Sequence, residues 1–366
     1  MRKYGKSAII LALLIFIMPV WAACTRLPLP GTNGWNIADG TTLPDEPKET
    51  IAEPPASSTT VPTAAPTSTS VLTPIPTPSP SPSPSPIPSP SPSPTSTPTP
   101  TPTLTPTPIP TSPPVSGNID EAKILSLDNT TRGWWYRVPK PPFEDIPAGI
   151  DAPIQDLLDK YGAYWQAKPK PGKKTVYITM DEGYEYEENT TSILNTAREK
   201  GVKINFFITG HFLKSRPDLV KRMLAEGHLV GSHTYSHPST PDLLAKKGVS
   251  AVVDDLRRLE KEYTALTGQN IAMWLRPPQG SYSEATLELW RQMGYKPVMW
   301  SFAYRDWEVN AQPKPKDAKE RILGELHDGS ILLIHAVSKT NAQILGSIID
   351  GIRERGYSIE LLSDLP

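Results

Sequence analysis

Hydrophobic and polar positions follow two different periods in the last two thirds of the chain. Seven short runs are rich in β-branched and aromatic residues, which is typical of buried strands. Between these runs, apolar residues recur three and four positions apart, as on a helix with one buried face. We expect strands at 175–180, 203–210, 228–233, 272–278, 296–303, 330–337 and 357–362, with helices that include 191–200, 250–267 and 341–355.

Glycines follow the expected helices, at the position where a left-handed residue commonly ends a helix. They are Gly201, Gly227, Gly268, Gly294 and Gly356. Seven alternations of strand and helix indicate one parallel sheet with crossover helices. The pattern and its flank occupy about 249 residues, close to the roughly 250 residues of one (β/α) barrel. The predicted fold is a distorted (β/α) barrel of about seven parallel strands.

Composition separates the first third of the chain from the rest. The chain has 366 residues and 44 prolines, and most of residues 25–117 are Pro, Ser and Thr. Such a sequence cannot bury enough apolar area to fold, and proline biases it toward extended polyproline II. We therefore expect a disordered linker at 25–117 and a folded domain at 118–366. Within that domain, we expect an N-terminal extension at 118–172 and the barrel at 173–366.

Residues 1–24 have the character of an export signal. Basic residues precede an apolar run from 8 to 23 that is short for a membrane span, and the only cysteine, Cys24, follows in the sequence VWAAC. This segment is similar to a bacterial lipobox, so we expect a lipid on Cys24 that anchors the protein to a membrane. Cleavage after Ala22 or Ala23 and an uncleaved signal anchor are the alternatives. All three place the domain outside the cytoplasm, facing the cell wall.

The charge balance argues against a nucleic-acid partner. With 37 basic and 38 acidic residues, the chain has a formal net charge of −1. A single cysteine provides no internal disulfide, so the domain must be stabilised by its core, and we expect a monomer. The expected N-terminal extension contains aromatic residues that could plug one end of the barrel or line a sugar-binding groove. They are Trp134, Trp135, Tyr136 and Trp165.

Candidate catalytic residues lie at the carboxyl ends of the expected strands, where parallel α/β folds place their chemistry. Asp181 and Glu182 follow the first strand. His233 and His237 lie four positions apart after the third strand. Two imidazoles and a carboxylate can make a metal site with room for water.

Three more strand ends carry polar residues. Arg276 is followed by two prolines that hold the loop, and Asp306 and Trp307 lie near the end of another strand. His335 ends a very apolar strand, where it could be a satisfied core residue, but its register matches the other candidates. The remaining histidines are not accompanied by other candidate residues in the sequence, and we expect them to be structural or surface residues. They are His211, His228 and His327.

The order of these motifs resembles a known family. TMDEG, HTYSH, RPPQG, an aspartate–tryptophan pair and LIH are similar to the five motifs of the polysaccharide deacetylases, carbohydrate esterase family four, or NodB homology domain. The stretches RGWWY, KYGAYW, TGHF, SFAYRDWEVN and HAVSKTNA look like those of the delta-lactam-biosynthetic de-N-acetylases. Those enzymes act on muramic acid residues of peptidoglycan. The similarity spans residues 133–365.

The resemblance implies a metal site and a general base. Glu182, His233 and His237 would hold a divalent ion of the zinc type, which lowers the pKa of bound water toward about 7 and polarises the acetyl carbonyl. Asp181 would accept the proton of the attacking water, and Arg276 would keep this carboxylate ionised and oriented. Glu182 departs from the aspartate of the family and the asparagine common in the narrower group. The ion could therefore be held chiefly by the two histidines.

The resemblance also implies an acid and a substrate pocket. His335 would donate a proton to the departing nitrogen, and Asp306 would keep this histidine charged and fixed. A backbone N–H beyond Gln279 or near Tyr184 could share the oxyanion. Gln279 replaces the tyrosine usual at its position. The residues expected to contact substrate are Tyr184, Gln279, Trp307 and Leu333.

The implied function is metal-dependent hydrolysis of N-acetyl groups on amino sugars of peptidoglycan glycan strands, with N-acetylmuramic acid favoured. On a muramic acid without its peptide, the freed amine could attack the lactyl carboxyl and close a delta-lactam. Deacetylation of N-acetylglucosamine in peptidoglycan or a chitin-like polymer is the alternative enzymatic function. A catalytically silent glycan-binding domain is the alternative of a different class, although a binder has no use for a base and an acid around a metal.

Overall fold

The main sheet is parallel and contains all seven predicted strands. The structure is a computed structural model that describes residues 118–139 and 146–365, so the predicted leader, Cys24 and the linker lie outside the described residues. The strand order is β7-β5-β4-β3-β2-β8, and β9 also pairs with β2. The strands are β2 (Lys174–Glu182), β3 (Asn205–Ile208), β4 (Leu229–Ser232), β5 (Ala272–Leu275), β7 (Lys296–Pro297), β8 (Ser330–His335) and β9 (Tyr357–Ile359).

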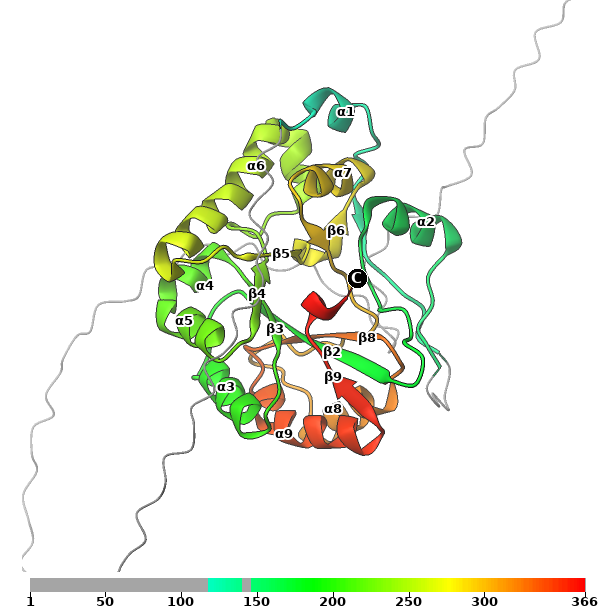
Figure 1. Ribbon diagram of the computed structural model, residues 1–366, viewed down its shortest axis with the longest axis vertical. Coiled ribbons are helices and arrows are strands. Elements are labelled where there is room, and N and C mark those ends of the chain that lie inside the picture. The colour runs from blue at the N-terminus through cyan, green and yellow to red at the C-terminus, as the bar shows by residue number, and fades with distance from the viewer. Residues whose placement is uncertain (1–117, 140–145, 366) are drawn as a thin grey trace, which may run out of the picture.

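The sheet is strongly curved, as the ribbon view shows (Figure 1). β7 has two residues instead of the eight predicted for 296–303, because the following segment leaves β5 and crosses toward β8. Val298 still donates its N–H to Leu275 O, at 2.8 Å, but Phe302 forms a parallel bridge with Leu332 on β8. The predicted distorted barrel is therefore confirmed.

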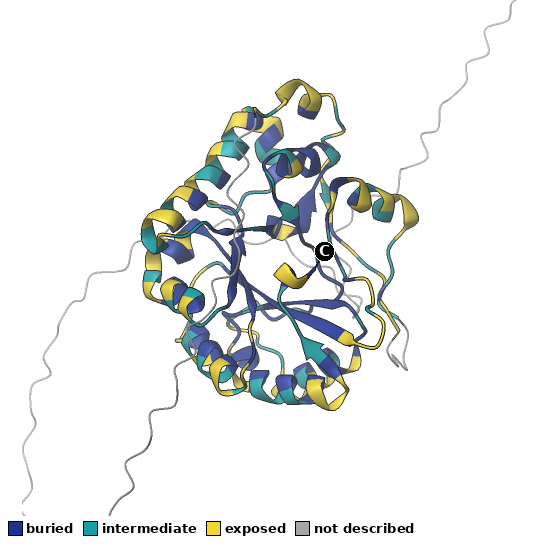
Figure 2. Cartoon of the chain, in the orientation of Figure 1, coloured by how far each residue is buried: buried dark blue, intermediate teal, exposed yellow. Residues whose placement is uncertain are grey.

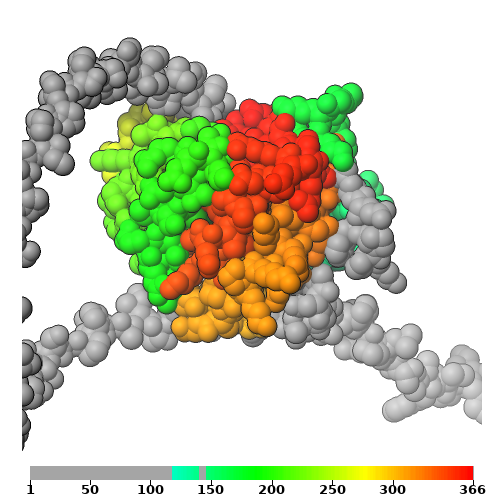
Figure 3. Space-filling model, turned by 90° about the horizontal axis from the view of Figure 1, so that it is seen from below, coloured from blue at the N-terminus to red at the C-terminus, as the bar shows by residue number. Residues whose placement is uncertain are grey.

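Helices cover the outer face of the sheet, with exposed residues outward and buried strands inside (Figure 2). Figure 3 shows α3 beside α9, and α8 on the other side of α9. The three helices predicted by range correspond to α3, α6 and α9, and all five predicted cap glycines have positive φ. The helices are α3 (Asn189–Glu199), α4 (Gly210–Ser215), α5 (Pro217–Ala225), α6 (Thr240–Thr267), α7 (Glu284–Gln292), α8 (Pro315–Gly324) and α9 (Lys339–Glu354).

The residues before β2 pack onto the barrel. Trp134 and Trp165 are buried with ring centroids 5.9 Å apart, and the Trp134 indole N–H donates to Trp300 O, at 3.0 Å. Burial therefore explains these two rings, whereas Trp135 is 37% exposed. The additional elements are α1 (Glu121–Leu125), β1 (Arg132–Gly133), α2 (Ala152–Tyr161), η1 (Pro278–Gly280), β6 (Ser281–Tyr282), which pairs antiparallel with β1, and η2 (Leu362–Asp364).

Side chains along β2 alternate between two hydrophobic cores. Val176, Ile178 and Met180 pack with apolar residues of the helices outside the sheet. Tyr177 packs on the other side, with the N-terminal extension and α7. Since successive side chains of a strand point to opposite faces, Asp181 lies on the face of Tyr177. Glu182 lies on the face covered by helices.

Among the described residues, no helix combines the length and the apolar character needed to cross a membrane.

Candidate active site

A carboxylate and an imidazole face each other across two neighbouring strands. Asp181 on β2 is in register with His335 on β8, and paired residues of parallel strands project from the same face of the sheet. The Asp181 side chain is buried, with Oδ1 3.6 Å from Arg276 Nε and Oδ2 3.5 Å from His233 Nε2. Predicted residues from four strand ends therefore converge on one point.

Arg276 is fully buried beneath this carboxylate. Its Nη2 donates to Thr179 Oγ1, at 2.6 Å, and its guanidinium lies over the rings of Phe207 and Trp300. Burial raises the pKa of Asp181 and lowers the pKa of Arg276 to about 10, while each charge partly offsets the effect on the other. Thr179 was missed in the sequence, although a position two residues before Asp181 had to share its face.

The two predicted histidines converge through their Nε2 atoms, which lie 3.1 Å apart. His233 Nδ1 lies 2.9 Å from Arg276 O. A carbonyl can only accept, so this nitrogen carries the proton and Nε2 presents its lone pair to the site. Burial lowers the pKa of His233 to about 3, which keeps the ring neutral at physiological pH. Thr234 and His237 both have positive φ, and His237 N donates to Thr234 Oγ1 within this tight turn.

Two of the three predicted metal ligands fit a divalent ion. Imidazole nitrogens that approach one point are preferred ligands of zinc and similar metals, and the carbonyl that accepts from His233 Nδ1 fixes the tautomer that His233 needs. The nearest carboxylate to His233 among the described contacts is that of Asp181. Within the described part of the chain, no group of three or more histidine, cysteine, aspartate or glutamate side chains is arranged to hold a metal.

The structure does not bring Glu182 into this group. Strand β2 continues through Glu182, so this side chain projects from the opposite face to Asp181 and accepts from Thr190 Oγ1 of α3, at 3.3 Å. Its other oxygen, Oε1, is buried without a hydrogen bond. Burial, followed by the nearby Glu185 and Asp181 charges, raises the pKa of Glu182 well above its usual range. In this strand the two adjacent carboxylates therefore project from opposite faces.

The second predicted pair forms a tight dyad. Asp306 is fully buried and accepts from His335 Nδ1 at 2.7 Å and from His335 N at 2.8 Å. The Trp307 ring centroid lies 5.6 Å from that of His335, and Leu333 lies two residues earlier on the same face of β8. Asn341 also donates to Asp306, at 2.6 Å. Asn341 was not predicted from the sequence, although it lies in the HAVSKTNA stretch.

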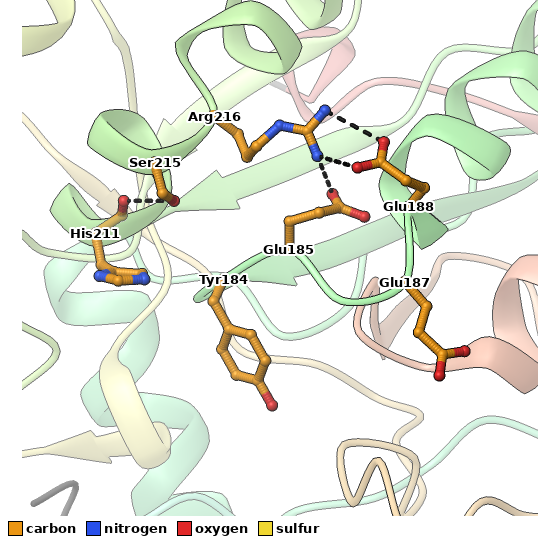
Figure 4. Close-up of a pocket in the computed structure, with 7 residues that line it drawn as sticks. All are labelled: Tyr184, Glu185, Glu187, Glu188, His211, Ser215 and Arg216. Atoms are coloured by element: carbon orange, nitrogen blue, oxygen red, sulfur yellow. Dashed lines mark hydrogen bonds and ion pairs between the residues drawn. The ribbon is translucent and has the colours of Figure 1, made fainter. Parts of the chain in front are cut away.

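The remaining predicted contacts lie at the rim. Gln279 is exposed with a φ of 57°, but the next amide, Gly280 N, already donates to Pro277 O. Tyr184, 38% exposed, lines a cavity of about 560 Å³ between the loop after β2 and α4. Figure 4 shows Arg216 between Glu185 and Glu188 in this cavity. The lining residues are Tyr184, Glu185, Glu187, Glu188, His211, Ser215 and Arg216.

The other three histidines lie away from Asp181 and its neighbours, as predicted. His228 is buried, accepts from Ile204 N at 3.0 Å, and has a pKa lowered by burial to about 4. His327 is also buried, and its backbone N–H donates to Ser330 Oγ. His211 is exposed at the cavity rim.

Several known proteins are similar to this chain in sequence. A family model described as polysaccharide deacetylase matches residues 168–298. A peptidoglycan-N-acetylmuramic acid deacetylase of Bacillus subtilis, PdaA, is 36% identical over 219 residues, which cover 60% of this chain and 81% of PdaA. An uncharacterized 30.6 kDa protein of Geobacillus stearothermophilus is 42% identical over 57% of this chain and 77% of its own length.

The comparison with solved structures also finds a carbohydrate esterase of family four. The solved structure of Bacillus subtilis PdaA, a family 4 carbohydrate esterase, superposes with a TM-score of 0.59 at 33% identity, covering 65% of this chain and 98% of that one. The similarity in sequence extends over most of the relatives' own length. The chain therefore belongs to the polysaccharide deacetylase family, carbohydrate esterase family four, and is an N-deacetylase of the hydrolase class.

Proposed function

We propose that this enzyme is a metal-dependent deacetylase of peptidoglycan glycan strands that prefers N-acetylmuramic acid. The observation that carries the chemistry is the register of Asp181 with His335, which gives a base and an acid on one face of two adjacent strands. The substrate preference rests on the similarity to PdaA, whose name specifies muramic acid. A catalytically silent binder would not need this pair beside two convergent imidazoles.

The residues of the chain divide the hydrolysis between them. Asp181, held beside Arg276, accepts a proton from water as the water oxygen attacks the acetyl carbonyl carbon. His335, with Nδ1 donating to Asp306, delivers a proton from Nε2 to the sugar nitrogen as the C–N bond breaks. The products are acetate and a free amine. Trp307 and Leu333 wall the acetyl group, and Tyr184 and Gln279 contact the sugar at the rim.

His233 and His237 are the ligands that we assign to the metal, with zinc as the expected ion. When bound, such an ion supplies electrophilic assistance to the acetyl carbonyl. The neutral state of His233 and its fixed tautomer prepare it for this role.

The test measures acetate release by residues 118–366, with added zinc or with chelator, beside an Asp181→Asn variant. The substrates are glycan strands stripped of peptide by an amidase, and N-acetylglucosamine oligomers. We expect release from the stripped strands only, and about a 10²- to 10⁴-fold loss in the variant, the usual contribution of a general base.

A second outcome would favour glucosamine. The peptidoglycan-N-acetylglucosamine deacetylase PgdA of Listeria monocytogenes is 31% identical over 193 residues, so release from the oligomers would move the assignment to that substrate. Binding of sugar without release from either substrate would overturn the enzymatic assignment for these substrates.

We also propose that the enzyme works outside the cytoplasm as a monomer, with a lipid on Cys24 and residues 25–117 as the tether to the wall. The VWAAC sequence and the Pro/Ser/Thr composition support this location. Mass spectrometry of the mature N-terminus tests it. A diacylglycerol-modified Cys24 is expected, and an unmodified terminus at residue 23 or 24 would replace the anchor with simple secretion.

A further inference from the structure

We propose that Asn341 is a positioning residue that fixes the Asp306–His335 dyad through its side-chain amide. The inference rests on the proposed function, in which His335 is the acid. The starting observation is that the Asp306 carboxylate accepts three hydrogen bonds, and only two of them come from His335. The third donor is Asn341, in the first turn of α9.

Asn341 is buried, and both ends of its amide are engaged. Nδ2 donates to Asp306 Oδ2 at 2.6 Å and to His335 O at 3.1 Å. Oδ1 accepts from the hydroxyl of Tyr304, which is buried as well. One side chain thus holds the carboxylate of Asp306 and the backbone of His335 at the same time.

The helix that carries Asn341 is itself clamped to the loop that carries Asp306. Ser338 caps α9 by accepting from Asn341 N at 3.2 Å, and its hydroxyl donates to Gln312 Oε1 at 2.6 Å. Gln312 Nε2 returns a bond to Asp306 O at 2.8 Å. Asn341 and Asp306 therefore keep their relative position through side chain and backbone.

The chemical consequence follows from the geometry of the acid. Only one orientation of the Asp306 carboxylate can accept from Nδ1 and from the backbone N–H of His335 together. A fixed carboxylate selects the Nδ1–H tautomer, so that Nε2 faces the substrate side. Without Asn341, Asp306 Oδ2 and the Tyr304 hydroxyl each lose a partner, and only the two hydrogen bonds from His335 still orient the carboxylate.

The primary experiment observes the dyad without requiring substrate. The Nδ1–H proton of His335, held against a buried carboxylate, gives a resonance downfield of the amide region in the full-length protein in detergent micelles. Loss of this signal in His335→Gln identifies it. We expect Asn341→Leu, which preserves the side-chain shape without its donors, to abolish or broaden the signal.

A matched control separates positioning from general loosening. Asn189 is another buried asparagine, and its Nδ2 donates to Val337 O, at 3.0 Å, two residues beyond His335. Asn189→Leu removes a comparable bond without touching Asp306, so the downfield signal should persist. Tyr304→Phe is a conservative second variant that should weaken the signal if Asn341→Leu fails to fold.

Kinetics provide a further readout on the deacetylation substrate. We expect Asn341→Leu to lower kcat about 10- to 100-fold, as for other side chains that orient a functional residue, with KM changed less than about threefold.

Loss of the downfield signal in Asn341→Leu with retention in Asn189→Leu would support the proposal. Retention of the signal in Asn341→Leu and in Tyr304→Phe, or equal loss in both asparagine variants, would overturn it. Because the spectra require no turnover, failure of the proposed substrate leaves this result decisive.

Discussion

Asp181 and Glu182 are neighbours in the chain, but strand β2 gives their carboxylates different surroundings. Asp181 lies beside a guanidinium and an imidazole, whereas Glu182 is held by a threonine on α3. The sequence suggests one site for both side chains. The pleat of the strand separates them, so the two histidines are the metal ligands that we propose.

This separation predicts how metal affinity responds to substitution. His237→Ala should abolish zinc binding at micromolar concentration, because one of two converging imidazoles is lost. Glu182→Gln should change the dissociation constant less than about tenfold, the lower end of the effect of an outer-shell residue. Isothermal titration with zinc, followed by metal analysis of the dialysed protein, measures both. A larger loss in Glu182→Gln than in His237→Ala would return Glu182 to the ligand set.

Some residues of the candidate site could be predicted from the sequence, and others could not. Asp181, His233, Arg276 and His335 were predictable because strand ends concentrate functional side chains. Asn341 was not, since a buried asparagine in a helix has no distinctive spacing. Its role depends on the position of α9 relative to the loop after β7, which only the assembled barrel defines.

At the scale of elements, the turn that begins β8 shows how closely the N-terminal extension approaches the sheet. Gly329 has a φ of 84°, and its carbonyl accepts from Ala167 N, at 2.8 Å. A Cβ at this glycine would lie 2.2 Å from Ala167 O, which is a backbone atom and cannot rotate away. The turn therefore requires glycine for two reasons: its φ is positive, and a side chain would collide with the backbone of Ala167.

Gly329→Ala should destabilise the protein by about 3–5 kcal/mol, because the backbone strain and the collision add. Urea unfolding measures the change. Gly248, the break inside α6, is the matched control, since its φ is 81° but a Cβ there would meet nothing within 4 Å. Gly248→Ala should cost about 1–3 kcal/mol, the backbone strain alone, because a φ of 81° with a ψ of 178° is a conformation that few residues other than glycine adopt. Equal costs at the two positions would contradict this account.

A carboxylate links α1 to α7 and predicts a dependence on pH. Glu288 is buried, and hydrogen bonds from Arg291, with further help from Lys123 and Gln292, lower its pKa to about 2. The unfolded value is near 4.5, so this carboxylate stabilises the fold above pH 4.5 and loses that contribution as pH falls toward 2.

Glu288→Gln should therefore cost on the order of 1–3 kcal/mol at pH 7 and about half of that or less at pH 3. The free energy of unfolding from urea titrations at both pH values, for the variant and the original chain, gives the comparison. A difference that stays constant with pH would mean that packing of Glu288, not its charge, holds α1 in place.

The elements themselves were largely predictable. Seven strands appeared where β-branched and aromatic residues cluster, because a parallel sheet buries both of its faces. The sequence overstated β7, whose residues change partner from β5 to β8 within a few positions. The pair of β1 and β6 was missed, since two-residue strands leave no periodic signal.

At the scale of the whole molecule, the N-terminal extension is part of the core. Leu158 and Trp165 are buried in the same cluster as Tyr177 of β2 and Trp290 of α7. We expect a chain that begins at residue 173 to be insoluble or unfolded, whereas one that begins at residue 118 folds. Circular dichroism and thermal unfolding of the two pieces test this, and equal unfolding temperatures would show that the extension is dispensable.

The pairing of β2 with both β8 and β9 also sets the order of events during synthesis. β2 is made first among the strands of the main sheet, but β8, which covers the edge of β2 opposite β3, belongs to residues 330–335, which are made near the end of the chain. Until then that edge stays open to wrong partners. During this time Asp181 on β2 has no His335 opposite it, so a partly made chain lacks the pair that we propose as base and acid.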